Sequence, residues 1–306
     1  MERMMREDTV NFILPEMKEI AWNNDEMYQH TIMMEHRVQR LKKKQNTTRQ
    51  KLNDALQESY EKNSRVLQEF DDIVDWTIEN GQEKLTQIMA QMSDLLFRER
   101  QYRQNVIQTW YHHQDADRAV MQAVEKVQEQ YVRRMEQLES NDDYLQECME
   151  KGARFSKEQL EFFWREEEYA QKDYERIQNR LQSSLEYVQM QRQTTYSGME
   201  RNLHVLSAAW QAIEKKLEEL CGHMKEIYGE LGEKESKRLC MIVKEETETL
   251  EEISKIWHNH IGLDRQIQEA YQEKIKNDGR DMRWMEEIYA ATQAEVHKSS
   301  YQKSKR

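Results

Sequence analysis

Apolar residues recur every three or four positions along most of the chain, which is the spacing of one face of an α-helix. The pattern is clearest between residues 85 and 145, at Leu85, Ile88, Met92, Leu95, Tyr102, Val106, Val120, Val124, Val127, Tyr131, Leu138 and Leu145. Polar residues occupy the same face at Glu99, His113 and Asp117. A helix this long cannot bury its apolar stripe by itself, so we expect it to lie beside another long helix.

Few residues interrupt the pattern, and they predict where helices begin and end. Pro15 fits the first turn of a helix, where its missing N–H is not needed. Asn80-Gly81 is a candidate break, and so is the segment 229–233, which contains two glycines. Asn277-Asp278-Gly279 predicts a later helix end.

The best candidate turn in the chain is Lys151-Gly152-Ala153-Arg154. Ser156 and Gln159 follow it at the spacing of a capping box, with Phe155 and Leu160 placed as a hydrophobic staple. The long segments on either side of this turn are similar in length. They can therefore pack against each other in antiparallel orientation.

We predict an all-α protein, an elongated coiled coil or long antiparallel helical bundle with a hairpin turn near residues 150–155. A divergent three-helix repeat of the spectrin type stays open as an alternative. The expected parts are an N-terminal segment (1–15), a first arm (16–150, candidate break at 80–81), a second arm (151–278, candidate break at 229–233), and a terminal helix with a basic tail (279–306).

The composition agrees with long helices that bury only a narrow stripe. Charged residues make up 34% of the 306 positions, with one proline, eight glycines and a mean hydropathy of −1.08. Only two positions in seven need be apolar along such a stripe. The longest uninterrupted apolar run has far fewer than the roughly 20 residues needed to span a membrane.

The net charge limits the classes of partner that the chain can bind, and the cysteines indicate its cellular compartment. A net charge of −12 argues against nucleic acid as a partner and weakens binding to anionic lipid. Two basic runs, at residues 40–51 and 298–306, are interpreted as solvated surface, although peripheral membrane contact stays open. The three cysteines lack the spacing of a disulfide framework, so we expect a reducing, cytoplasmic location.

The sequence carries no motif that predicts catalysis or a cofactor. None of the nine histidines has a glutamate three residues before it, as di-iron bundles require. Cys221 and His223, like His258 and His260, are two positions apart and point to different sides of a helix. There is no glycine-rich phosphate loop or nucleophile elbow. We therefore expect no enzymatic activity, no metal and no cofactor.

Aromatic residues are more informative than the histidines and cysteines. Two adjacent aromatic side chains cannot both lie on one narrow apolar stripe of a helix. One interpretation is a bundle of three or more helices, whose wider core covers both members of a pair. The other is a set of exposed anchors for a partner protein. The candidate anchors are Trp110, Tyr111, Phe163, Trp164, Trp257 and Trp284.

The pattern favours a non-catalytic structural or scaffolding protein of cytoskeletal, ciliary or secretion-assembly type. Such a protein binds partner proteins along its sides, and we expect self-association. The alternative is a helical dimer that binds or shapes membranes, which would need a concave basic face. A helical toxin would need an apolar insertion segment, and none is found in the sequence.

Overall fold

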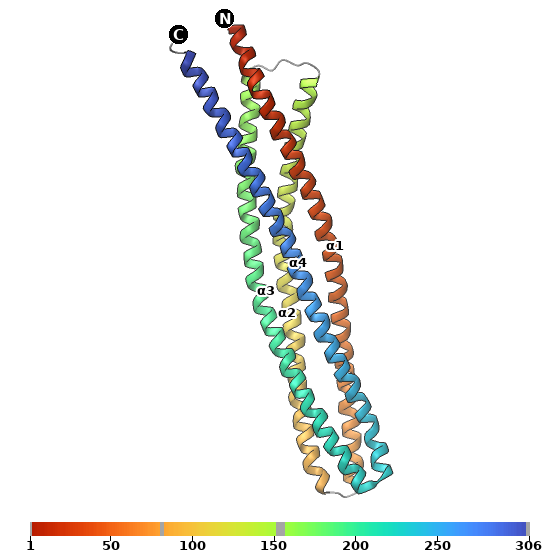
Figure 1. The fold of residues 1–306 in the computed structure, drawn as a ribbon. Helices are drawn as coiled ribbons and strands as arrows, with labels where there is room; N and C mark the ends of the chain where they lie inside the picture. The colour runs from red at the N-terminus through yellow and green to blue at the C-terminus, as the bar shows by residue number, and fades with distance from the viewer. Residues whose placement is uncertain (1, 80–82, 151–156, 304–306) are drawn as a thin grey trace. The chain divides into compact units, whose positions relative to one another are not determined.

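The fold was obtained as a computed structural model that describes residues 2–79, 83–150 and 157–303. Side chains are described mainly between residues 25 and 134 and between 172 and 277. These residues form long helices and no strand, as the periodicity predicts (Figure 1). The helices are α1 (Glu2–Glu79), α2 (Glu83–Glu150), α3 (Lys157–Tyr228) and α4 (Glu230–Lys303).

The helices divide into two packed units, and each helix contributes a segment to both. The first unit contains residues 1–41, 120–188 and 266–306. The second contains residues 42–119 and 189–265. Within the described residues, no helix has an apolar stretch long enough to cross a membrane.

The second unit is an antiparallel four-helix bundle. Hydrogen bonds join Asn53 of α1 to Trp110 of α2, and Asn63 to Glu99 further along, so these two helices run in opposite directions. Trp210 of α3 likewise donates to Thr247 of α4. The core is one continuous cluster of apolar side chains drawn from all four helices, including Leu52, Phe70, Met92, Val106, Leu206, Trp210, Leu239 and Trp257.

Between residues 85 and 117, the buried positions of α2 other than Ile88 follow an alternation of three and four residues. They are Leu85, Met89, Met92, Leu96, Glu99, Arg103, Val106, Trp110, His113 and Asp117. The alternation predicted from the sequence is confirmed, with two local errors: Leu96 and Arg103 are buried, whereas the predicted Leu95 and Tyr102 are half-buried. The polar residues Glu99, His113 and Asp117 lie inside, as their spacing predicts.

In the first unit, α2 and α3 are also antiparallel neighbours. The hydroxyls of Tyr131 and Tyr174 lie 2.5 Å apart, and Gln178 of α3 donates to the backbone oxygen of Ile275 in α4. The ammonium of Lys274 lies 3.2 Å from the centre of the Tyr131 ring, within the range of a cation–π interaction.

Two expected helix boundaries are wrong. Helix α1 includes Pro15 instead of beginning there, because one missing N–H removes a single hydrogen bond from a helix of 78 residues. Helix α4 includes Asn277-Asp278-Gly279, so residues 279–303 continue α4 and are not a separate helix. The predicted turn at 151–155 and the predicted break at 80–81 lie outside the described residues.

The reversal between α3 and α4 depends on two glycines. Gly229 has a φ of +62°, a left-handed conformation that side chains disfavour. A Cβ on Gly232 would lie 2.2 Å from the backbone oxygen of Met224, because the first turn of α4 packs tightly on the end of α3. The glycines that interrupt the sequence pattern at 229–233 therefore allow the chain to reverse.

We expect Gly232→Ala to lower the free energy of unfolding by about 1–3 kcal/mol, because the new methyl group overlaps backbone. Gly222→Ala is the matched control on α3, where a Cβ meets nothing within 4 Å. It should raise stability by up to about 1 kcal/mol, as alanine favours helix. Chemical denaturation measures both, and equal effects of the same sign would contradict the close approach at Gly232.

We expect Val124→Asp to destabilise the first unit by about 3 kcal/mol or more, because Val124 is fully buried and the carboxylate would lack a partner. Ala123→Asp places the same charge on the neighbouring exposed position and should cost only a few tenths of a kcal/mol. Thermal unfolding followed by circular dichroism compares the two. An unchanged transition in the Val124 variant would show that this face of α2 is not core.

Candidate functional site

A buried layer of polar side chains crosses the second unit, and each helix contributes two residues to it. The members of each pair are four residues apart, which places them on the same face of their helix. All are buried except the half-buried Arg49. The pairs are Gln45 and Arg49 of α1, His113 and Asp117 of α2, Arg192 and Tyr196 of α3, and His260 and Asp264 of α4.

Asp117 is bound by two arginines. Arg192 donates to Oδ1 through Nε at 2.9 Å and also through Nη2, while Arg49 donates to Oδ2 at 2.8 Å. Burial opposes ionisation of this carboxyl, but the two guanidinium groups outweigh it and hold the pKa of Asp117 below its usual value. Arg49 belongs to the basic run at residues 40–51, so this cation lies against a carboxylate and not on open surface.

Asp264 has less positive charge around it than Asp117. Its Oδ2 accepts from the Tyr196 hydroxyl at 2.5 Å, and its Oδ1 accepts from the amide of Gln45. The nearest guanidinium nitrogen of Arg192 lies 3.5 Å from Oδ1. Burial raises the pKa of Asp264, because Arg192 opposes this only in part and the charge of Asp117 adds to it.

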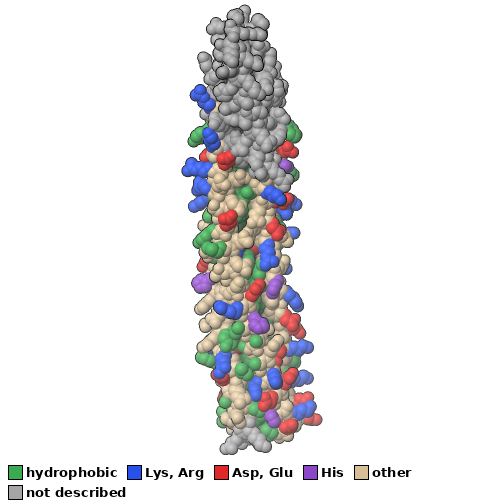
Figure 2. All heavy atoms as spheres, turned by 60° about the vertical axis from the view of Figure 1, so that its left-hand side comes forward, with side chains coloured by type: hydrophobic (Ala, Val, Ile, Leu, Met, Phe, Trp, Pro, Cys, Tyr) green, Lys and Arg blue, Asp and Glu red, His purple; other side chains and the backbone are tan. Residues whose placement is uncertain are grey.

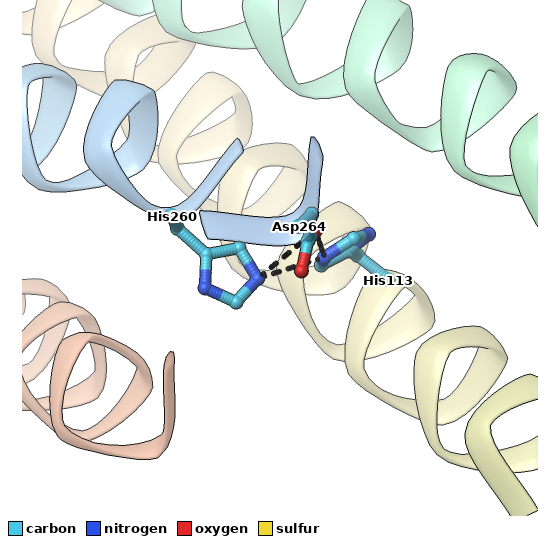
Figure 3. Close-up of side chains that lie close together, drawn as sticks. All are labelled: His113, His260 and Asp264. Atoms are coloured by element: carbon cyan, nitrogen blue, oxygen red, sulfur yellow. Dashed lines mark hydrogen bonds and ion pairs between the residues drawn. The ribbon is translucent and has the colours of Figure 1, made fainter. Parts of the chain in front are cut away.

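Two imidazoles meet beside the Asp264 carboxylate (Figure 3). The Nε2 atoms of His113 and His260 lie 3.1 Å apart. They lie 3.7 Å and 3.6 Å from Oδ2 of Asp264, respectively. Burial lowers the pKa of each histidine to about 4, since an imidazolium is poorly solvated here, so both rings are neutral at neutral pH.

A hydrogen bond links the ring of His113 to Thr195. The Thr195 hydroxyl lies 2.9 Å from the backbone oxygen of Arg192 and 3.0 Å from Nδ1 of His113. When the hydroxyl donates to that backbone oxygen, it accepts from Nδ1–H of His113. In that tautomer, Nε2 of His113 accepts from Nε2–H of His260. Nδ1 of His260 has no hydrogen-bond partner among the described residues.

Two of the candidate aromatic anchors form the walls of this layer. Trp110 stacks on His113 with ring centres 5.6 Å apart, and Trp257 stacks on His260 at 5.9 Å. Both tryptophans are fully buried, which favours the interpretation of a core wider than a two-helix stripe. Tyr111 is exposed, at 57% of its surface. The side chains of Phe163, Trp164 and Trp284 lie outside those the structure describes.

A second cluster of buried polar side chains lies in the same unit, between the polar layer and the α3–α4 reversal. Arg103 binds Glu99 on its own helix and Glu246 of α4, the latter at 2.7 Å. Asn63 donates to Glu99 at 2.6 Å, and Ser59 donates to Glu246. Burial raises the pKa of both glutamates, because one arginine only partly offsets the burial of two carboxyl groups.

Cys221 and Cys240 face each other near the α3–α4 reversal, with sulfur atoms 2.8 Å apart. A hydrogen bond from the Cys240 thiol lowers the pKa of Cys221 to about 7. Accordingly the pKa of Cys240 is raised, since its proton is held between the two sulfurs. The two cysteines are 19 positions apart in the chain, and the helix reversal brings them together.

The sequence pattern predicted some members of the polar layer but not others. His113 and Asp117 were recognised as polar residues on the buried face of α2. The four-residue spacing of His260 and Asp264 was a usable signal, because it places an imidazole and a carboxylate on one helical face. Arg192, which lies 75 residues from Asp117 in the chain, required the packing of α3 against α2.

The layer combines two kinds of chemistry. The arginine and carboxylate groups form ion pairs that connect all four helices, from Arg49 through Asp117 and Arg192 to Asp264. The two imidazole nitrogens and the Asp264 oxygen are ligand atoms that transition metals accept in proteins. Comparisons of the chain with protein-family models, curated proteins and solved structures found no match.

The Glu246→Gln variant tests whether the pKa of Glu246 is raised in the second cluster. Because the folded-state pKa of Glu246 lies above its unfolded value, the folded chain holds a proton that the unfolded chain releases as pH rises from about 4.5. Wild-type stability should therefore fall with rising pH in this window relative to the variant, by up to about 1.4 kcal/mol per pH unit.

Urea denaturation of both proteins across that pH range measures the difference. Glu248→Gln makes the same change at an exposed position of α4 and serves as the control. A stability difference between wild type and Glu246→Gln that stays constant with pH would contradict the raised pKa.

Proposed function

We propose that the chain is a non-catalytic scaffold that holds partner proteins along the sides of a helical bundle. The observation that carries this proposal is the polar layer shared by four helices in the second unit. Sliding of the helices would separate the paired charges of this layer, so we expect the layer to resist sliding. Binding sites carried on these helices would therefore keep a fixed separation.

Large apolar side chains on the outer surface support contact with a protein partner. Phe97 and Tyr111 on α2 are exposed at 63% and 57% of their surface, and Met190 and Met241 are exposed on α3 and α4. Figure 2 shows apolar side chains scattered among charges of both signs over the part of the chain that it colours. Aromatic residues on such a surface are frequent centres of protein–protein binding energy.

The interior of the second unit is compatible with a role that requires stiffness. Trp110, Trp210 and Trp257 fill it with rings that are at most 1% exposed. Trp110 and Trp210 donate their indole N–H groups to Asn53 and Thr247. Close packing of the three rings, with two of the indole N–H groups hydrogen-bonded, supports a role that requires stiffness.

The double variant Phe97→Ser and Tyr111→Ser tests this proposal. Cross-linking of the full chain in its native cell, followed by mass spectrometry, should identify partner proteins or a second copy near these residues. We expect the double variant to reduce that cross-linking about tenfold, corresponding to about 1.4 kcal/mol of binding energy. Circular dichroism checks that the fold is unchanged.

The matched control replaces Gln101 and Gln108, two exposed polar residues of α2, by serine. It should leave the cross-links unchanged. The proposal would be contradicted by a wild-type chain that neither self-associates nor forms a stoichiometric complex with another protein. Salt-sensitive co-sedimentation with anionic vesicles in place of protein partners would favour the membrane alternative.

A further inference from the structure

We propose that His113, His260 and Asp264 bind one divalent first-row transition metal ion, with zinc as the best-suited member of this class. The ion would lie between α2 and α4 inside the second unit. This assignment is independent of the scaffold proposal, because it rests on the geometry of three buried ligand atoms. It replaces the expectation from sequence that the histidines hold no metal.

The three ligand atoms already have the separation that a metal ion requires. Their mutual distances are 3.1 Å, 3.6 Å and 3.7 Å. In the plane of the three atoms, the point equidistant from all of them lies about 2.0 Å from each, as follows from these edges. Zinc binds histidine nitrogen at about 2.0–2.1 Å and carboxylate oxygen at about 2.0–2.2 Å. The spacing of the three atoms therefore matches that of zinc ligands.

Neighbouring residues orient the ligands. Thr195 accepts the Nδ1 proton of His113, which directs the lone pair of Nε2 toward the proposed ion. Metal-binding histidines in proteins are commonly held in this way by a hydrogen bond to the other ring nitrogen. Tyr196 donates to Oδ2 of Asp264 and Gln45 donates to Oδ1, so both carboxylate oxygens are held in place.

The electrostatics of the layer favour an additional cation at this point. Asp117 is paired with both Arg192 and Arg49, so the Asp264 carboxylate has only a longer contact with Arg192. Metal binding would move the proton that lies between the two Nε2 atoms to Nδ1 of His260, so that both neutral imidazoles offer an Nε2 lone pair. A bound dication would add a second positive charge beside the buried Asp264 carboxylate, whose contact with Arg192 is the longer of the two that Arg192 makes.

The ligand types select the class of metal. Two imidazole nitrogens with one carboxylate oxygen suit zinc, cobalt, nickel or copper, whereas magnesium and calcium prefer oxygen ligands alone. Three protein ligands leave a fourth position of a tetrahedral ion for another ligand. Because His113, His260 and Asp264 are at most 1% exposed, an ion reaches the site when the bundle opens or folds.

The test loads the full chain by refolding it with excess Co²⁺ or Zn²⁺, followed by exhaustive dialysis and metal analysis. Co²⁺ also reports four-coordinate geometry through its visible absorption. We expect wild type to retain one ion per chain. His260→Gln should weaken binding by at least about 100-fold, and Thr195→Val by about 10–100-fold, because Thr195 positions a ligand.

Two controls exclude other sites. His258→Gln changes an exposed histidine two residues from His260 and should retain the metal. A variant with Cys148, Cys221 and Cys240 replaced by serine should also retain it, which excludes the thiol pair. Failure of wild type to retain metal would overturn the proposal, as would retention by His260→Gln or loss in the cysteine variant. If His260→Gln does not fold, two measurements still test the proposal: the number of metal ions per wild-type chain and the metal affinity of Thr195→Val.

Discussion

A charged side chain buried among helices must meet its opposite charge, and this constraint governs the second unit. Arg192 lies between two buried carboxylates, and Asp117 gains Arg49 as a second partner. Removing one member of such an arrangement leaves an uncompensated buried charge, which costs about 3–5 kcal/mol. Replacing the whole set with apolar residues is often neutral. We therefore expect the layer to contribute more to the choice of helix register than to stability.

Helical periodicity predicted the architecture well, because burial of one face requires apolar residues at fixed spacing. Val106, Val124 and Tyr131 are buried as their spacing predicts. The boundaries were harder to predict, since Pro15 and Gly279 lie within helices that continue past them. A local break signal costs about 1–3 kcal/mol, which packing along a long helix can outweigh.

The composition of the polar layer could be predicted only in part. The pairs at four-residue spacing, such as His113 and Asp117, are visible in the sequence as polar residues on an apolar face. Which pairs meet depends on how four helices align, and that is a property of the whole bundle. His113 and His260 are 147 residues apart, and no local pattern brings them together. The roles of Trp110 and Trp257 as walls of the layer follow from the same alignment.

Register and metal binding are linked through the same residues. The helix positions that pair Arg192 with Asp117 also bring His260 to His113 and both to Asp264. A slip by one heptad would separate these groups by about 10 Å along the bundle. An ion bound between α2 and α4 would in turn oppose such a slip, because it would bind only the aligned arrangement.

The most direct test of register control is a spin-label distance measurement within the second unit. Labels at the exposed positions Gln50 of α1 and Lys255 of α4, in a chain with its cysteines replaced by serine, report the alignment of these helices. We expect one narrow distance distribution in this chain. Leucine at positions 49, 117, 192 and 264 should add populations shifted by a heptad. A single unchanged distribution in that variant would contradict the claim that the polar layer sets the register.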